Sequence, residues 1–159
     1  MPVKFAAASR ADLDALVALL GALFAQEKDF SPNPANQARA LKLILSKKKI
    51  GTIYVARDRG RVVGMVSVLD TISTAEGGRA GLLEDLVVAP GARGRGIGRA
   101  LLRHAIAASR KRGLLRLTLL TDGGNRRAQR LYARAGFRLS AMRPMRRKLA
   151  AARRRSSRG

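Results

Sequence analysis

The sequence has no cysteine and no tryptophan, and it has only six aromatic residues, four Phe and two Tyr. Without cysteine, the chain has no disulfide, no thiolate ligand for zinc and no cysteine nucleophile. No apolar run approaches the roughly 18 residues of a membrane-spanning helix. Asp12 and Asp14 interrupt the apolar stretch that a secretory signal would need. We therefore expect a cytoplasmic protein with no membrane partner, and no constellation of metal ligands is visible.

Acidic residues are also scarce, because 10 Asp and Glu stand against 33 Lys and Arg and give a net charge of +23. Eight of the basic residues lie in the last 17 positions, so most of them are spread over the rest of the chain. A field of this sign attracts polyanions and anionic small molecules. Because aromatic side chains are needed to stack bases and are few here, we interpret the charge first as an anion-attracting surface. Nucleic acid is the second class of partner that the charge permits.

The length of 159 residues is typical of one domain with its own core, and 47% of the residues are apolar. Residues 1–149 carry the periodic apolar blocks and are predicted to be that domain. Residues 150–159 (AAARRRSSRG) lack such a pattern and are predicted to be a basic, disordered tail.

Apolar periodicity predicts ten elements in the order βααβββαβαβ. Ser9 and Asp12 have the spacing of a capping box, and Pro144 indicates that the last strand lies at an edge or ends early. The predicted elements are a strand at 3–7, helices from Ser9 to about Ala25 and at 35–45, strands at 52–57, 62–73 and 78–90, a helix at 97–112, a strand at 114–121, a helix at 125–136 and a strand at 137–149. This order predicts an α/β (α+β) domain whose mixed, mostly antiparallel sheet is flanked by helices.

A glycine-rich loop lies between the strand that ends in LVVAP and the amphipathic helix after it. Backbone N–H groups in such a loop converge on a phosphate, and the positive end of the following helix adds to the attraction. Arginine side chains add charge-assisted hydrogen bonds. We therefore predict a site for an anionic cofactor at Arg93, Gly94, Arg95, Gly96, Ile97 and Gly98.

Two nucleotide-binding patterns do not fit this loop. The phosphate-loop pattern of NTPases requires Lys followed by Ser or Thr after its last glycine, whereas Arg99 and Ala100 follow Gly98. The Rossmann pattern requires the loop to follow the first strand and an acidic residue about 20 positions later. Here the loop comes late, and Thr118 to Leu120 occupy that position.

Two segments resemble conserved blocks of the GCN5-related N-acetyltransferase (GNAT) family. The segment EDLVVAPGARGRGIGRALL at 84–102 is similar to the family's motif A, and NRRAQRLYARAGF at 125–137 is similar to its motif B. The resemblance implies a fold in which the fourth and fifth strands separate and the acetyl-pantetheine arm of acetyl-CoA lies between them. It also implies that the backbone of Leu86, Val87 and Val88 binds this arm and polarises the thioester carbonyl.

The resemblance also suggests roles for several side chains. Tyr132 matches the family's tyrosine near the thioester sulfur, where a phenol with a pKa near 10 is protonated and able to donate. Asn125 is expected to cap its helix, to bind the cofactor, or both. Glu84 is our preferred base, and strand alternation sends its neighbour Asp85 to the other face unless a bulge intervenes. Glu27 and Asp29 are instead candidates for contact with a cationic substrate.

These inferences predict an enzyme, an N-acetyltransferase that moves the acetyl group of acetyl-CoA to a primary amine of a small molecule or peptide. The amine would attack directly in a ternary complex, with acetyl-CoA as co-substrate and no metal. The alternative is a nucleic-acid-associated or ribosome-associated binding protein with the same fold and a basic surface. The sequence leaves open which amine is the acceptor and whether the chain forms a homodimer.

Overall fold

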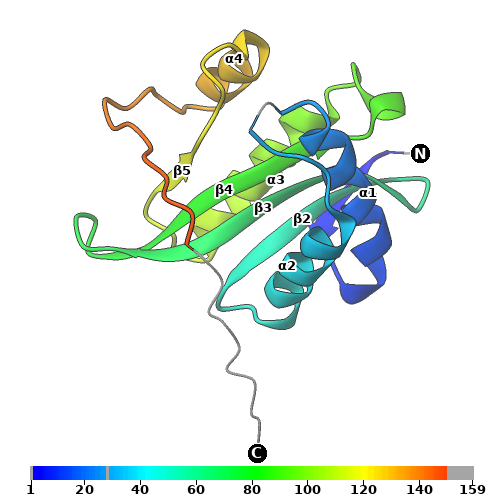
Figure 1. Ribbon diagram of the computed structural model, residues 1–159, viewed down its shortest axis with the longest axis horizontal. Coiled ribbons are helices and arrows are strands. Elements are labelled where there is room, and N and C mark those ends of the chain that lie inside the picture. The colour runs from blue at the N-terminus through cyan, green and yellow to red at the C-terminus, as the bar shows by residue number, and fades with distance from the viewer. Residues whose placement is uncertain (1, 28, 150–159) are drawn as a thin grey trace, which may run out of the picture.

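A five-stranded sheet, with its strands side by side in sequence order, is the frame of the computed structural model, which describes residues 2–27 and 29–149 (Figure 1). The first four strands pair antiparallel and the fifth pairs parallel to the fourth. They are β1 (Lys4–Ala7), β2 (Gly51–Asp58), β3 (Arg61–Ser73), β4 (Gly78–Val88) and β5 (Leu117–Leu119). The predicted mixed, mostly antiparallel sheet is confirmed.

The β2–β3 hairpin turns through two residues. Arg59 and Gly60 both have positive φ, 49° and 78°, and Asp58 pairs with Arg61. Two positive φ values give a turn whose twist matches that of the flanking strands.

Helices cover both faces of the sheet (Figure 1). The helix α1 (Leu13–Phe24) and the helix α2 (Pro34–Ser46) lie on one face, and α3 (Ile97–Lys111) forms the crossover from β4 to β5 on the other. The helix α4 (Arg126–Arg134) packs Leu131 and Tyr132 against the α3 side. None of the helices within the described ranges combines the length and hydrophobicity needed to cross a membrane.

Two short 3-10 turns lead into the main helices. The first, η1 (Arg10–Asp12), carries the predicted capping box, in which Ser9 N–H donates to Asp12 Oδ2 at 2.8 Å. The second, η2 (Pro90–Ala92), follows β4. Asp12 also accepts two hydrogen bonds of 2.8 Å from Arg57, so the start of α1 is tied to β2.

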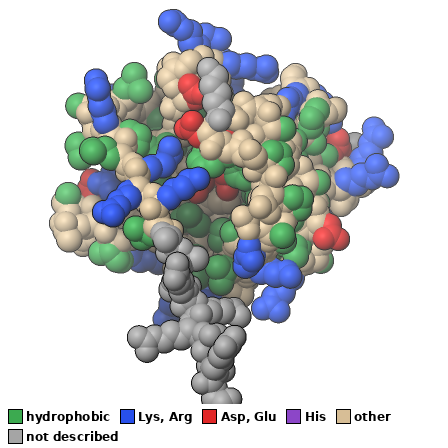
Figure 2. All heavy atoms as spheres, in the orientation of Figure 1, with side chains coloured by type: hydrophobic (Ala, Val, Ile, Leu, Met, Phe, Trp, Pro, Cys, Tyr) green, Lys and Arg blue, Asp and Glu red, His purple; other side chains and the backbone are tan. Residues whose placement is uncertain are grey.

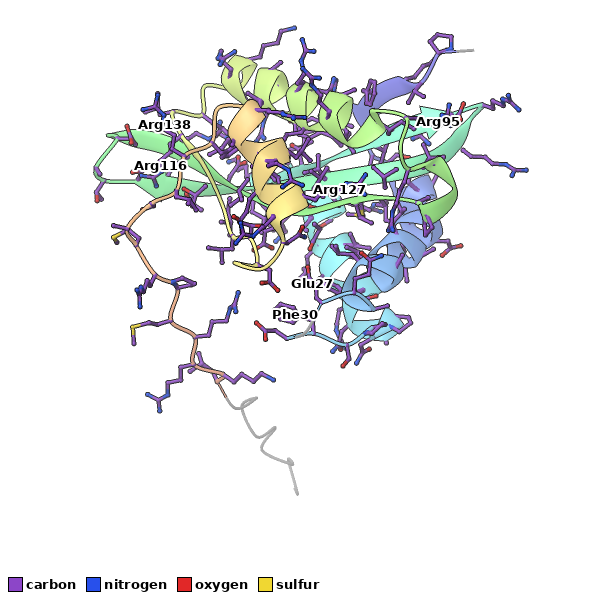
Figure 3. The ribbon with its side chains drawn as sticks, turned by 90° about the horizontal axis from the view of Figure 1, so that it is seen from above. Glu27, Phe30, Arg95, Arg116, Arg127 and Arg138 are labelled. Atoms are coloured by element: carbon purple, nitrogen blue, oxygen red, sulfur yellow. The ribbon has the colours of Figure 1, made fainter. Side chains whose placement is uncertain are left out.

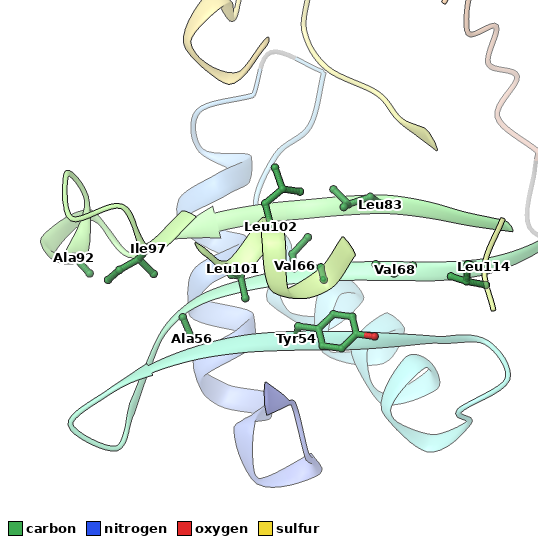
Figure 4. Packing of buried hydrophobic residues seen from close by; sticks show 11 residues of the cluster. Tyr54, Ala56, Val66, Val68, Leu83, Ala92, Ile97, Leu101, Leu102 and Leu114 are labelled. Atoms are coloured by element: carbon green, nitrogen blue, oxygen red, sulfur yellow. The ribbon is translucent and has the colours of Figure 1, made fainter. Parts of the chain in front are cut away.

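The two apolar clusters on the two faces follow the alternation of the strands. On β2, Tyr54 and Ala56 are buried with α3, as Figure 4 shows, whereas Ile53 and Val55 are buried with α1 and α2. Successive side chains of a strand point to opposite faces, so one strand supplies both cores. His104, the single histidine, lies between Phe5 and Tyr54 with ring centroids at 5.9 and 5.4 Å, which is a packing role.

The predicted last strand at 137–149 is wrong. Within 137–149 the chain forms no strand, and Leu139, Met142 and Met145 are 85–96% exposed. These apolar residues recur every third position rather than alternately, Pro144 lacks an N–H donor, and β5 offers only three residues to pair with. The predicted basic tail, 150–159, lies outside the described residues.

Candidate active site

The fourth and fifth strands separate after a short paired stretch. Gly81 to Leu83 of β4 pair with Leu117 to Leu119 of β5, and the pairing ends there. Beyond Leu83, β4 still pairs with β3 on its other side, up to Val88 opposite Gly64. Within the described part of the chain, no strand pairs with the β5-facing side of Leu86, Val87 and Val88. Their backbone is therefore open to a ligand on that side, which is where the resemblance puts the acetyl-pantetheine arm.

A β-bulge in β4 lies at the start of this opening. Glu84 is opposite Ser67 and Val87 is opposite Met65, so two residues of β4 face one of β3. Leu83 and Leu86 accordingly pack on the same side, with α3, although they are three positions apart. The extra residue is Asp85, whose φ is 56°.

The glycine-rich loop joins η2 to α3 and has the backbone that an anion site needs. Gly94 and Gly96 have positive φ of 78° and 75°, a conformation that favours glycine. The first helical hydrogen bond runs from Ala100 N–H to the Gly96 carbonyl at 3.0 Å. The N–H groups of Ile97, Gly98 and Arg99 therefore have no partner within the helix and point out of its N-terminal end.

The two arginines of the loop are bound within the protein. Arg93 donates from Nε to the Val88 carbonyl at 3.0 Å, and Arg95 forms an ion pair of 2.7 Å with Asp58 at the hairpin turn. With the Gln26 amide oriented so that its oxygen faces Arg93, that oxygen accepts hydrogen bonds from Nη2 at 3.0 Å and from Nη1 at 3.2 Å. Both arginines thus position the loop, and their contact with phosphate stays a prediction.

The helix α4 brings the two predicted motif B residues beside the opening. Asn125 caps the helix by accepting from the Ala128 N–H at 3.1 Å, as expected. Tyr132 packs edge-to-face on Phe137 with ring centroids 6.0 Å apart. Burial raises the pKa of the Tyr132 phenol above its usual value, and the charge of Glu27 raises it further. The phenol is therefore protonated at neutral pH.

Acidic side chains gather at the same opening. Burial raises the pKa of Asp85 to about 7, and the charges of Glu84 and Glu27 contribute. The pKa of Glu27 is also raised, first by loss of solvation and then by Asp29, with smaller contributions from Asp122 and Glu84. Figure 2 shows this face hollowed over β4, with acidic side chains in the hollow and along its upper rim and basic side chains around it.

Four of these carboxylates have no ion-pair partner among residues 2–27 and 29–149, namely Glu27, Glu84, Asp85 and Asp122. Elsewhere Asp12, Asp58 and Asp70 each pair with arginine. With 33 basic residues available, unpaired acids are expected to be rare. The concentration of four of them at one opening gathers negative charge within a strongly positive molecule; a fifth, Asp14, is exposed on α1.

Sequence reasoning did not identify Asp85 or Asp122 as site residues. Asp85 needed the bulge, which alternation within one strand does not reveal. Asp122 lies in the loop after β5, where its side chain accepts from the Gly124 N–H at 2.8 Å and looks like an ordinary turn residue. The sequence did contain one signal for them. Acidic residues are scarce in this chain, so the position of each one is more informative about a site than the position of a basic residue.

A separate cavity of about 400 Å³ lies between α3, β5 and the residues after α4. Leu114, Leu117 and Phe137 are among its lining residues. None of the predicted site residues lines it, so it is distinct from the opening beside β4.

Comparison with known proteins agrees with this geometry. The model of the acetyltransferase (GNAT) family matches residues 17–137. An uncharacterized N-acetyltransferase of Bacillus subtilis, YhfO, is 32% identical over 123 residues, which are 76% of this chain and 82% of that protein. A mycothiol acetyltransferase of Propionibacterium freudenreichii is 33% identical over 79% of this chain, but the match spans only 40% of that longer protein.

Among solved structures, an integron cassette protein from the Cole Harbour salt marsh metagenome superposes with a TM-score of 0.80. It is 28% identical, and the match covers 92% of this chain and 91% of that one. The match of the family model to most of the chain, together with the relatives named as N-acetyltransferases, establishes both the kinship and the reaction type. The chain belongs to the acetyltransferase (GNAT) family and is an acyl-CoA-dependent N-acetyltransferase.

Proposed function

We propose that the enzyme transfers the acetyl group of acetyl-CoA to a primary amine by direct attack, with both substrates bound in the opening beside β4. The proposal is supported by the open side of β4 beyond Leu83, together with two groups that both feel the charge of Glu27: the neutral phenol of Tyr132 and the carboxyl of Asp85, whose pKa is about 7. A proton donor and a proton acceptor are what amine acetylation requires.

The donor is bound from two directions in this proposal. The N–H groups at the start of α3, from Ile97 to Arg99, hold the pyrophosphate, and the glycines keep side chains out of its way. The unpaired side of β4 from Leu86 to Val88 pairs with the amides of the pantetheine arm. One N–H of this segment polarises the thioester carbonyl.

Asp85 and Tyr132 carry out the proton transfers of the proposed reaction. An ammonium group gives one proton to Asp85, and the resulting amine nitrogen attacks the carbonyl carbon. The carbon–sulfur bond breaks, and Tyr132 gives its proton to the departing thiolate. The nitrogen then loses a second proton, which restores Tyr132, so the products are an amide, a thiol and one proton held by Asp85.

We assign the base role to Asp85 rather than to Glu84, the residue that the sequence favoured. A base works best when its pKa lies near the operating pH, and the pKa of Asp85 is raised to about 7. Asp85 is also the extra residue of the bulge, whereas Glu84 continues the regular pairing with Ser67.

Release of free thiol from acetyl-CoA, measured with a panel of amines, amino acids and peptides, tests the proposal. We expect thiol release that depends on the amine and an acetylated product detected by mass spectrometry. Initial rates with both substrates varied should give intersecting double-reciprocal lines. Parallel lines would instead indicate a covalent acetyl-enzyme and would overturn direct attack.

A further inference from the structure

A cationic side chain of the protein itself lies at the mouth of the acidic opening. The guanidinium carbon of Arg146 is 5.7 Å from the centre of the Phe30 ring, and Arg146 Nη1 is 3.7 Å from Asp29 Oδ2. Phe30 is 48% exposed, and its ring packs against that of Phe24 on α1, with ring centroids 5.8 Å apart. An aromatic face beside a carboxylate is a favourable site for a cation.

The position of Arg146 is selective within its segment. Residues 138–149 contain five basic residues, and among the described residues only Arg146 forms an ion pair. The apolar residues of the same segment stay exposed, so packing does not bring Arg146 to this place. The contact therefore shows one cation seated against Phe30 and Asp29.

The mouth is coupled to the reacting end by charge. Arg146 lowers the pKa of Glu27, whereas Asp29 and Glu84 raise it. The charge of Glu27 in turn acts on Asp85 and Tyr132. The charges of Asp29, Glu27 and Asp85 therefore act on one another in sequence from the mouth to the bulge. Figure 3 shows Glu27 and Phe30 on the loop after α1, facing the segment after β5.

We propose that Asp29 and Phe30 form a subsite for the second positive group of a diamine or polyamine acceptor, whose first amine reaches Asp85. The inference rests on the proposed amine acetylation and names its substrate class. In the free enzyme Arg146 occupies the subsite and mimics this group. A cationic substrate displaces it when it binds.

The energies permit such an exchange. The side chains of Arg146 and Asp29 are 58% and 75% exposed, and ion pairs as exposed as this are weak. A resident cation held so loosely competes only modestly with a substrate. A diamine gains the same ion pair and ring contact, and in addition it presents its other amine to the unpaired acids of the opening.

Matched substrates test the subsite. With 1,4-diaminobutane and butylamine as acceptors, we expect kcat/KM to be roughly tenfold higher for the diamine, which has a second cation at the same chain length. The variants Asp29→Asn and Phe30→Ala should each lower kcat/KM for the diamine much more than for butylamine, and so remove most of this preference. Asp14→Asn, which removes an exposed charge on α1, is the control and should keep the preference.

The resident cation has its own test. Arg146→Ala should lower KM for the diamine about two- to fivefold because a competitor is removed. Arg143→Ala, in the same exposed segment, should not. Equal kcat/KM for the two amines, or an unchanged preference in both subsite variants, would overturn the subsite. Absence of transfer to every amine would refute the proposed function instead, so the two failures can be told apart.

Discussion

Asp85 combines two features that are unfavourable for folding. Its φ of 56° lies in the left-handed region, which costs a residue with a side chain roughly 1–2 kcal/mol. Its carboxyl is also partly buried beside Glu84 and Glu27, which raises its pKa to about 7. Strain and desolvation of this kind persist where a site needs them.

The change Asp85→Asn should separate activity from folding. Activity in the parent enzyme should fall as the pH drops below about 7, because Asp85 becomes protonated and cannot accept a proton. The variant should lose about 100-fold in kcat and no longer show this acidic limb. The measurement is kcat/KM against pH with one amine and saturating acetyl-CoA.

Thermal unfolding provides the control for this variant. Because the folded-state pKa of Asp85 is raised, its cost to stability is absent below the ordinary pKa of aspartate and grows as the pH rises to about 7. Asp85→Asn removes this cost, so it should stabilise the protein by about 1–4 kcal/mol at pH 8 and little at pH 4. A variant destabilised at pH 8 would contradict the assignment.

Tyr132 is expected to act on the leaving group rather than on binding. Tyr132→Phe keeps the ring that packs on Phe137 and removes only the hydroxyl. We expect kcat to fall about 100-fold while the Kd of acetyl-CoA, measured by calorimetry, changes less than about threefold. Equal losses in both quantities would indicate that the hydroxyl has a binding or packing role.

At the scale of elements, the loop before α3 separates two reasons for glycine. Gly96 has a φ of 75°, so a side chain there is strained, although a Cβ would meet no atom within 4 Å. Gly98 has an ordinary φ, and a Cβ there would touch only Val88 at 3.5 Å, a normal contact. The protein itself therefore needs glycine at 96 and not at 98.

This difference predicts opposite outcomes for two alanine variants. Gly96→Ala should destabilise the fold by about 1 kcal/mol. Gly98→Ala should leave the stability unchanged or slightly higher, yet weaken acetyl-CoA about tenfold, because its methyl group stands over the N–H groups that bind phosphate. Thermal unfolding with and without acetyl-CoA measures both effects. Tight binding by Gly98→Ala would show that the pyrophosphate lies elsewhere.

The elements of the fold were largely predictable because their signals are local. Alternating residues such as Ile53 and Tyr54 revealed strands, and the loop from Arg93 to Gly98 was placed before its helix. The bulge at Asp85 depends on pairing with β3, and the lack of a strand at 137–149 depends on how little β5 offers. Both features depend on how neighbouring strands pair in the folded protein, so the sequence of one segment alone could not reveal them.

At the scale of the whole molecule, the net charge is +23, whereas the opening beside β4 gathers carboxylates without an ion-pair partner among the described residues. In the proposed function, the positive net charge attracts the phosphates of acetyl-CoA and the carboxylates attract the amine. High salt should therefore weaken the binding of acetyl-CoA. We expect KM for acetyl-CoA to rise severalfold between about 0.05 and 0.3 M salt.

A truncated donor is the control for the salt prediction. Acetyl-pantetheine lacks the phosphates of acetyl-CoA, so its KM should depend little on salt. If both donors respond equally, the positive field does not act through the phosphates and the prediction is wrong.

The bulge in β4 has a consequence for how this enzyme can change. Because residue 85 is the extra residue of the bulge, it contributes to neither apolar cluster, while the two residues after it, Leu86 and Val87, pack into one cluster each. Substitutions at position 85 can therefore alter the chemistry of the opening without disturbing the interior. Position 85 is separated from the core in this sense, although β4 contributes side chains to both apolar clusters.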